Sequence, residues 1–245
     1  MPLIKKASLA IVILFFLSPT VRSQPSVDPL LVKLECPDRV KAVAFSPDGT
    51  LLAAGYGWND RTGVRIWNAA SYSIVANLSV GESNIDCIAF SPDGKLFAAA
   101  NWNGDVMLWR VGLWGIHKTP ILDRGSAQAL KFSPDSTKLA FATEDSAILY
   151  DLNSGKSRVL ASEKNDRKSF ISLSFSAGGN SLLVFRDEAL QVYVVKSGKL
   201  IDTWKPSGAG FFGNISDDGN YVIAGGGAIY GKKSVEIWSA SDKKR

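Results

Sequence analysis

The sequence predicts an all-β protein built from repeated four-stranded units, because one turn motif and one aromatic position recur along the chain. The turn Phe-Ser-Pro-Asp-Gly at residues 45–49 returns, with growing divergence, at residues 90–94, 132–136, 175–179 and 215–219. The copies are separated by 45, 42, 43 and 40 residues. Four short strands in a repeat of this length are typical of one β-propeller blade.

The first two strands of each repeat are expected to form a hairpin around this motif. In the first copy, an apolar run at residues 40–45 leads into the turn, and a second apolar run follows at residues 51–54. Pro47 sets φ for the second turn position, Asp48 suits the third, and Gly49 supplies the positive φ of the bulge. The motif therefore predicts both strands and the turn between them.

The third strand of each repeat carries an aromatic residue about twenty positions after the first residue of the turn. These aromatic residues are Trp67, Trp109, Tyr150, Tyr193 and Trp238. A fourth short strand, such as the run at residues 73–78, completes the unit. Four strands per copy then account for the whole period.

These repeats resemble the WD-repeat family, whose blades carry a similar Phe-Ser-Pro-Asp-Gly turn and a Trp-Asp pair at the end of the third strand. The resemblance covers roughly residues 30–240. The pair survives only as Tyr150-Asp151, and the Gly-His pair that opens a typical blade is missing from all five copies. In the family that histidine joins a buried hydrogen-bond network, so its absence implies blades held mainly by apolar packing.

Residues 1–23 are expected to form a cleavable export signal. Two lysines precede an apolar run at residues 7–17, and small residues at Val21 and Ser23 predict cleavage between Ser23 and Gln24. A membrane span would need about 20 apolar residues. We therefore expect a secreted or periplasmic protein with no membrane span after cleavage, the alternative being an uncleaved anchor.

The charge balance argues against a nucleic-acid partner. The whole chain has 28 basic and 23 acidic residues. Removal of the signal takes away Lys5, Lys6 and Arg22, which leaves 25 basic residues against 23 acidic ones. So small an excess is a weak electrostatic footprint, and export points the same way.

Residues 24–245 are expected to form one propeller domain. An apolar run at residues 30–35 precedes the first turn, whereas the chain ends after the third strand of the last repeat. The early strand can complete the last blade and close a ring of five blades, which would leave no unpaired edge. The rival architecture is an open arc, either part of a larger ring or dimeric.

The two cysteines, Cys36 and Cys87, would lie towards the same face of the propeller in a compartment that permits disulfides. A bridge between them would close a loop of about 50 residues and stabilise the fold by roughly 4 kcal/mol on the chain-entropy model. The alternative is two buried free thiols, because adjacent blades could hold the residues too far apart.

Catalytic and cofactor motifs are almost missing from the sequence. One histidine, His117, and no His, Cys or carboxylate cluster at ligand spacing argue against zinc, haem and iron–sulfur sites, so no cofactor is expected. A glycoside hydrolase would need two carboxylates facing each other across the channel. Of the residues that open the inner strands, among them Arg39 and Lys41, only Asp86 is an acid, and it would need Asp60, Asp123 or Asp166 opposite it.

The loops that enter the first strands and join the second and third strands should share one face of the propeller. Trp58-Asn59 and Trp102-Asn103 occupy equivalent places in adjacent repeats, and exposed Trp beside Arg is the composition of a binding hot spot. The alternative is that each Trp packs on its own blade. The predicted interface residues are Trp58, Asn59, Arg61, Trp102, Asn103, Arg124, Arg167, Lys168, Arg186, Tyr230 and Lys232.

These observations favour an exported, non-catalytic module or scaffold that binds a protein partner through one propeller face, as the WD-repeat resemblance implies. One alternative is an enzyme or a binder of a small ligand, such as a carbohydrate, at the channel mouth; another is a structural component of the cell envelope. A closed ring would be a monomer, and an open one could dimerise. Asn77 and Asn214 begin glycosylation sequons, whose use depends on the organism.

Overall fold

The computed structural model describes residues 31–58, 61–118, 126–162, 170–186, 189–205, 212–216, 220–226 and 234–239. The chain separates into two compact units, residues 1–34 and residues 35–245. The predicted signal segment and its Ser23–Gln24 cleavage site fall outside the described residues and stay predictions. Within the described ranges, no helix is both long enough and apolar enough to cross a bilayer.

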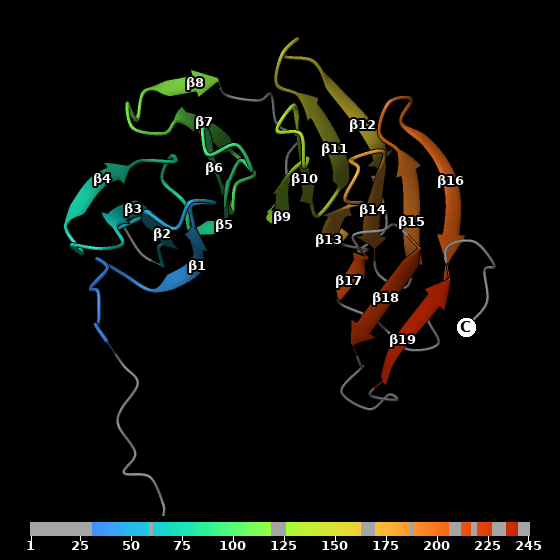
Figure 1. The fold of residues 1–245 in the computed structure, drawn as a ribbon, viewed down its shortest axis with the longest axis horizontal. Helices are drawn as coiled ribbons and strands as arrows, with labels where there is room; N and C mark the ends of the chain where they lie inside the picture. The colour runs from blue at the N-terminus through green and yellow to red at the C-terminus, as the bar shows by residue number, and fades with distance from the viewer. Residues whose placement is uncertain are drawn as a thin grey trace, which may run out of the picture. The chain divides into compact units, whose positions relative to one another are not determined.

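The described strands of the second unit form antiparallel sheets that follow one another along the chain from blue to red (Figure 1). The first sheet contains β1 (Val40–Phe45), β2 (Leu51–Tyr56), β3 (Gly63–Asn68) and β4 (Ile74–Leu78). The second contains β5 (Ile85–Phe90), β6 (Leu96–Asn101), β7 (Val106–Arg110) and β8 (Ile116–Lys118). The third contains β9 (Ala127–Phe132), β10 (Lys138–Thr143), β11 (Ser146–Asp151) and β12 (Ser157–Ser162). The fourth contains β13 (Phe170–Phe175), β14 (Ser181–Arg186), β15 (Ala189–Val194) and β16 (Lys199–Trp204), and the fifth contains β17 (Phe212–Ile215), β18 (Tyr221–Gly226) and β19 (Ser234–Ser239).

The serine of the repeated turn closes the first hairpin of every sheet. In the first sheet, the Ser46 amide donates to the Leu51 carbonyl, while the Ser46 hydroxyl oxygen accepts the Leu51 amide at 2.9 Å. The same amide-to-hydroxyl bond recurs at Ser91, Ser133, Ser176 and Ser216, at 2.9 to 3.1 Å. The repeated motif is therefore a hydrogen-bonded clamp as well as a turn of suitable φ.

The core lies between neighbouring sheets. The aromatic residue that the sequence placed on each third strand is at most 5% exposed. Each apolar cluster joins residues of two consecutive sheets; one, for example, packs Val64 and Ile66 of the first sheet against Ile85 and Phe97 of the second. The first strands adjoin in turn, β1 with β5, β5 with β9, β9 with β13, and β13 with β17. The predicted all-β, four-stranded architecture is confirmed.

The prediction of an N-terminal strand at residues 30–35 is wrong for residues 31–35, which the structure describes. Residues 31–36 form no strand, Leu31 is 91% exposed, and the fifth sheet has the order β17-β18-β19. A strand exists only through its ladder of hydrogen bonds to a neighbour, and these residues pair with none of the described strands. Closure of a five-bladed ring stays a prediction.

The Cys36–Cys87 bridge that the sequence left open is not formed, since both residues are free thiols. Cys87 packs between the second and third sheets, with its Sγ 3.9 Å from the carbonyl oxygen of Ala127. Cys36 follows Glu35, whose carbonyl accepts a hydrogen bond from Arg65 of the first sheet. The backbone next to Cys36 is therefore bonded to the first sheet, whereas the Cys87 thiol packs between the second and third sheets.

The positive φ of the turn glycine gives a direct stability prediction. Gly94 has φ of +70°, and an added Cβ would meet no atom within 4 Å, so Gly94→Ala tests backbone strain alone. We expect it to lower the free energy of unfolding by about 1 kcal/mol, measured by urea denaturation. Gly115→Ala is the matched control, because that site is equally open and has no positive φ. Equal stability of the two variants would contradict the argument.

Burial should make Cys87 a slow nucleophile. Burial, assisted by the charge of Asp86, raises the pKa of Cys87 to about 12. At mildly alkaline pH its thiolate fraction is then lower than in the unfolded chain by about a thousandfold, and alkylation should slow to match. The folded state keeps a proton that the unfolded chain loses, so the free energy of unfolding should fall as the pH rises from the ordinary thiol pKa towards 12.

Iodoacetamide labelling of a Cys36→Ser variant, with and without urea, measures this rate at Cys87 alone. Similar rates in the folded and unfolded protein would show that the thiol is not protected.

Candidate functional site

Trp58 and Trp102 lie on equivalent loops of the first two sheets. Trp58 follows β2 and Trp102 follows β6, and the two side chains are 53% and 51% exposed. The structure thus leaves half of each indole open to solvent, so packing against its own blade does not bury either side chain. Half-exposed Trp on adjacent blades is an apolar surface that a partner could cover.

Two cations hold these indoles. The guanidinium carbon of Arg39 lies 4.5 Å from the ring centroid of Trp58. The ammonium of Lys41 lies 5.5 Å from the Trp102 ring and 6.0 Å from the Trp58 ring, so one side chain contacts aromatic groups of two sheets. Cation–π contacts at exposed sites are worth roughly 0.5–1 kcal/mol each. These contacts restrict the orientation of the indoles and leave about half of each residue exposed.

Asp86 anchors the ammonium. Its Oδ1 lies 2.8 Å from Lys41 Nζ, and the two side chains are only 16% and 25% exposed. Asp86 Oδ2 is buried and has no hydrogen-bond partner among the described residues. The carboxylate therefore depends on Lys41, and through Lys41 it is connected to both indoles. We call Trp58, Trp102, Arg39, Lys41 and Asp86 the Trp58–Trp102 surface.

Asn84, at the entry to the second sheet, brings the two loops together. The Trp102 amide donates to the Asn84 carbonyl at 2.8 Å. A Cβ at Gly57 would lie 3.1 Å from the Asn84 Cα, so the Trp58 loop approaches this backbone closely because residue 57 has no side chain. The Gly57 amide also donates to the Arg39 carbonyl, which places Arg39 beside the same loop.

A buried amide stiffens the Trp102 loop. Asn101 is fully buried; its Nδ2 donates to the Val80 carbonyl at 2.7 Å and to Asp105 Oδ2 at 2.8 Å, and its Oδ1 accepts the Asp105 amide. The expectation that apolar packing mainly holds the blades is thus incomplete for the second sheet. There an asparagine in β6 supplies a buried polar network without a histidine.

The predicted interface residues are only partly brought together. Trp58 and Trp102 share Lys41, while Arg61 and Asn103 are exposed on the same two loops and Arg186 ends β14. Asn59, Arg124, Arg167, Lys168, Tyr230 and Lys232 fall outside the described residues, and their place in an interface stays a prediction.

Sequence reasoning placed Arg39, Lys41 and Asp86 at strand starts and considered only Asp86, as a catalytic acid. Their part in the aromatic surface was missed. The pairing register of the β1–β2 hairpin could have revealed it. Val40 pairs with Tyr56, so the start of β1 lies beside the end of β2, which Trp58 follows. Counting back from the turn would have placed Arg39 and Lys41 beside that loop.

The described side chains include no group of three or more His, Cys, Asp and Glu that could hold a metal ion. Asp86, the candidate acid, is engaged by Lys41. The carboxylates that a hydrolase would set opposite it, at Asp60, Asp123 and Asp166, fall in segments that the structure does not describe.

Comparisons with known proteins agree with the repeat pattern. The pattern of the family described as WD domain, G-beta repeat, matches residues 29–68 and 73–110. The chain is 27% identical over 167 residues to Periodic tryptophan protein 2 homolog of Mus musculus, covering 60% of this chain and 18% of that protein. It is 31% identical over 121 residues to an uncharacterized WD repeat-containing protein of Synechocystis sp., covering 47% and 32% respectively. The chain thus spans less than a third of either relative.

A solved structure supports the predicted propeller. The β-propeller domain of Cps50 (Swd1) from Myceliophteria thermophila matches with a TM-score of 0.67 and 21% sequence identity. The match covers 78% of this chain and 63% of that one. At this identity the similarity concerns the fold alone, and it confirms a β-propeller while the number of blades stays a prediction.

Removal of the Lys41 ammonium should destabilise the protein through Asp86. We expect Lys41→Met to lower the free energy of unfolding by about 2 kcal/mol, because it leaves a largely buried carboxylate unpaired. Adding Asp86→Asn should recover at least half of that loss, since the buried charge is then gone. Urea denaturation of the single and double variants measures the coupling.

The matched control is Lys95→Met, which breaks a more exposed ion pair, with 3.5 Å between Lys95 Nζ and Asp93 Oδ2. It should cost less than about 0.5 kcal/mol. A loss at Lys41 no larger than at Lys95 would show that Asp86 does not depend on the ammonium.

Proposed function

Because this chain belongs to the WD-repeat β-propeller family, we propose that it is a non-catalytic interaction module that binds a protein partner through the Trp58–Trp102 surface. Propellers of this family typically serve as protein–protein interaction scaffolds, and that general role suits a chain with few catalytic motifs. The family fold alone does not choose a surface, so the proposal depends on the geometry of this one.

One observation carries the proposal: two half-exposed indoles of adjacent blades share a single ammonium that is itself bonded to a carboxylate. Trp and Arg are the residues most often found at the energetic centre of interfaces. The indoles are held before a partner arrives, so little side-chain entropy remains to be lost on binding.

The charges around the indoles suit a protein surface better than a small anion. Asp86 already neutralises Lys41 at 2.8 Å, which leaves burial of the two rings as the main source of binding energy. A partner that presents an apolar patch to Trp58 and Trp102, with an acceptor for Arg39, would match this surface. The association rate of this partner should depend only weakly on salt, because Asp86 already pairs with Lys41.

Substitution of the indoles tests the proposal. A protein captured by the full chain and then purified should bind a Trp58→Ala, Trp102→Ala variant at least about thirtyfold more weakly, the equivalent of about 2 kcal/mol for one hot-spot side chain. Isothermal titration calorimetry measures the affinity, and circular dichroism verifies that the variant is folded.

Tyr72→Ala is the control, because Tyr72 is a 41% exposed aromatic residue in the turn after β3, at the opposite end of that strand from Trp58. It should leave the affinity unchanged. If the tryptophan variant bound as tightly as the Tyr72 variant, another surface would be responsible.

A further inference from the structure

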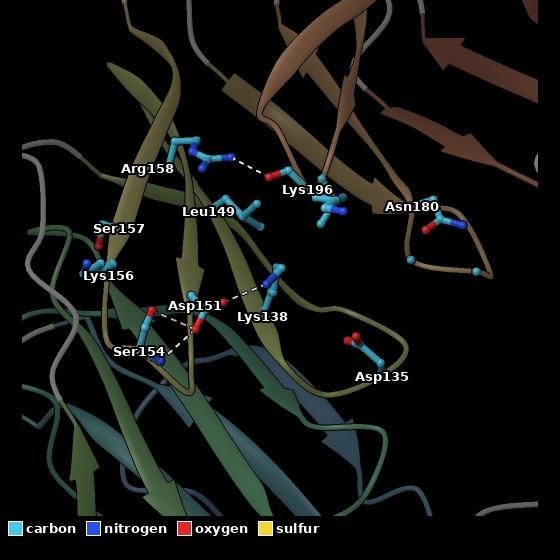
Figure 2. A pocket seen from close by; sticks show the side chains of 13 residues that line it. Asp135, Lys138, Leu149, Asp151, Ser154, Lys156, Ser157, Arg158, Asn180 and Lys196 are labelled. Carbon is cyan, nitrogen blue, oxygen red and sulfur yellow. Dashed lines mark hydrogen bonds and ion pairs between the residues drawn. The ribbon is translucent and has the colours of Figure 1, made fainter.

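A cavity separate from the Trp58–Trp102 surface lies between the third and fourth blades. Its volume is about 480 Å³, which is in the range of ordinary ligand sites. The turns β9–β10 and β11–β12 form one wall, and the turns β13–β14 and β15–β16 form the other (Figure 2). The Trp58–Trp102 surface uses the loops at the other ends of the strands, so the two sites do not share residues.

The lining of this cavity carries more positive than negative side chains. It contains four cationic side chains, Lys138, Lys156, Arg158 and Lys196, and two carboxylates, Asp135 and Asp151. Asp151 Oδ2 lies 2.7 Å from Lys138 Nζ, and its Oδ1 accepts the Ser154 amide and hydroxyl (Figure 2). These bonds, led by the one from Lys138, hold the pKa of Asp151 well below its usual range.

The second carboxylate is also satisfied within its own blade. Asp135 accepts hydrogen bonds from the Ser133 hydroxyl and from the Thr137 amide and hydroxyl. Lys156 and Lys196, by contrast, have no ion pair or hydrogen bond to their ammonium groups among the described residues. The cavity therefore presents positive charge that the described residues around it do not neutralise.

Arg158 is set in place across the two blades. Its Nη1 donates to the Lys196 carbonyl at 3.1 Å (Figure 2). Gly198 makes room for it, because a Cβ there would lie 2.5 Å from Arg158 Cδ. The guanidinium thus has a fixed position while most of its N–H groups remain available to an anion.

The first two blades do not carry this set of cations, although the fourth blade has Lys199 at the place of Lys156. By the register of the paired strands, the places of Lys138, Lys156 and Arg158 hold no Lys or Arg in the first two blades, where they are Leu51, Ser73, Val75, Leu96, Gly115 and His117. The place of Lys196 is Gly112 in the second blade and Asn153 in the third.

The fourth blade also loses a negative charge at this point. Its turn carries Gly178 where the first three blades carry Asp48, Asp93 and Asp135. Both walls of this groove are therefore more positive than the equivalent parts of the first two blades.

We propose that the cavity between the third and fourth blades binds an acidic peptide segment that carries an apolar side chain. The buried side chains of Leu149 and Val195 contribute an apolar part of the lining, and the cations surround it. A carboxylate on each side of an aliphatic residue would match this arrangement, with Arg158 able to bind one carboxylate in a bidentate manner.

Fluorescence anisotropy with the full chain tests the proposal. The probe is a labelled short peptide in which a central leucine is flanked by aspartates and glutamates, and the reference peptide replaces the acids with asparagine and glutamine. The acidic peptide should bind more tightly, and high salt should weaken it. Lys156→Gln with Lys196→Gln should weaken binding about tenfold, the sum of two modest ion pairs.

The matched control is Lys95→Gln with Lys205→Gln, which removes the same charge from exposed sites outside the cavity. It should change the affinity by less than about twofold. The Trp58→Ala, Trp102→Ala variant should bind the peptide normally, so failure of this proposal and failure of the proposed function can be told apart.

Gly178→Asp gives a variant that should fold well and still lose binding. Gly178 has no positive φ, and an added Cβ would meet only the flexible Asn180 side chain, at 3.3 Å. The new carboxylate could accept the Ser176 hydroxyl as Asp48, Asp93 and Asp135 accept theirs, so stability should be kept. It also places a negative charge in the cavity wall, which should weaken the acidic peptide about tenfold.

Three results would overturn the proposal: equal binding of the acidic and neutral peptides, equal weakening by the cavity and control lysine variants, or unchanged affinity in Gly178→Asp. Binding of inorganic phosphate to the full chain is measured as well. If phosphate binds and the acidic peptide does not, the cavity is an anion site and the peptide proposal is wrong.

Discussion

Each blade depends on one serine in its first turn, and this serine is buried in the first four blades. The hydroxyl of Ser91, for example, accepts the Leu96 amide at 2.9 Å and donates to Asp93, while its backbone amide bonds to the Leu96 carbonyl. These bonds join the two ends of a hairpin whose strands then present apolar faces to the next blade. Lost turn geometry would shift the strand register, and a shift of one residue would turn the apolar face to solvent.

The same turn explains why erosion of the repeat is tolerated. The fourth blade keeps Ser176 and its bond to the Ser181 amide, yet has Ala177 and Gly178 in place of Pro and Asp. The serine clamp survives without the carboxylate, so the position of the acid is free to vary. Where it varies, the groove beside it loses a negative charge, and that groove is the basic cavity between the third and fourth blades.

Polar side chains within and between blades also combine a structural role with a role at a surface. The second blade lacks the family histidine but buries Asn101 against Val80 and Asp105, and the network holds the Trp102 loop. Lys41 and Asp86 join the first blade to the second by an ion pair beneath the two exposed indoles. Structural bonds at this end of the strands therefore also preorganise the surface that we assign to a partner.

Local chemistry made the repeat, the hairpins and the position of the third-strand aromatic residues predictable from sequence, because turn propensity and two-residue alternation act over a few positions. It also placed Trp58 and Trp102 at the same strand end of adjacent blades. The contacts of Lys41 with both indoles and the cavity between Arg158 and Gly178 were decided only by the tertiary structure. Both form across neighbouring sheets, and the spacing of those sheets comes from packing between residues such as Gly55 and Ile85, which no short stretch of sequence specifies.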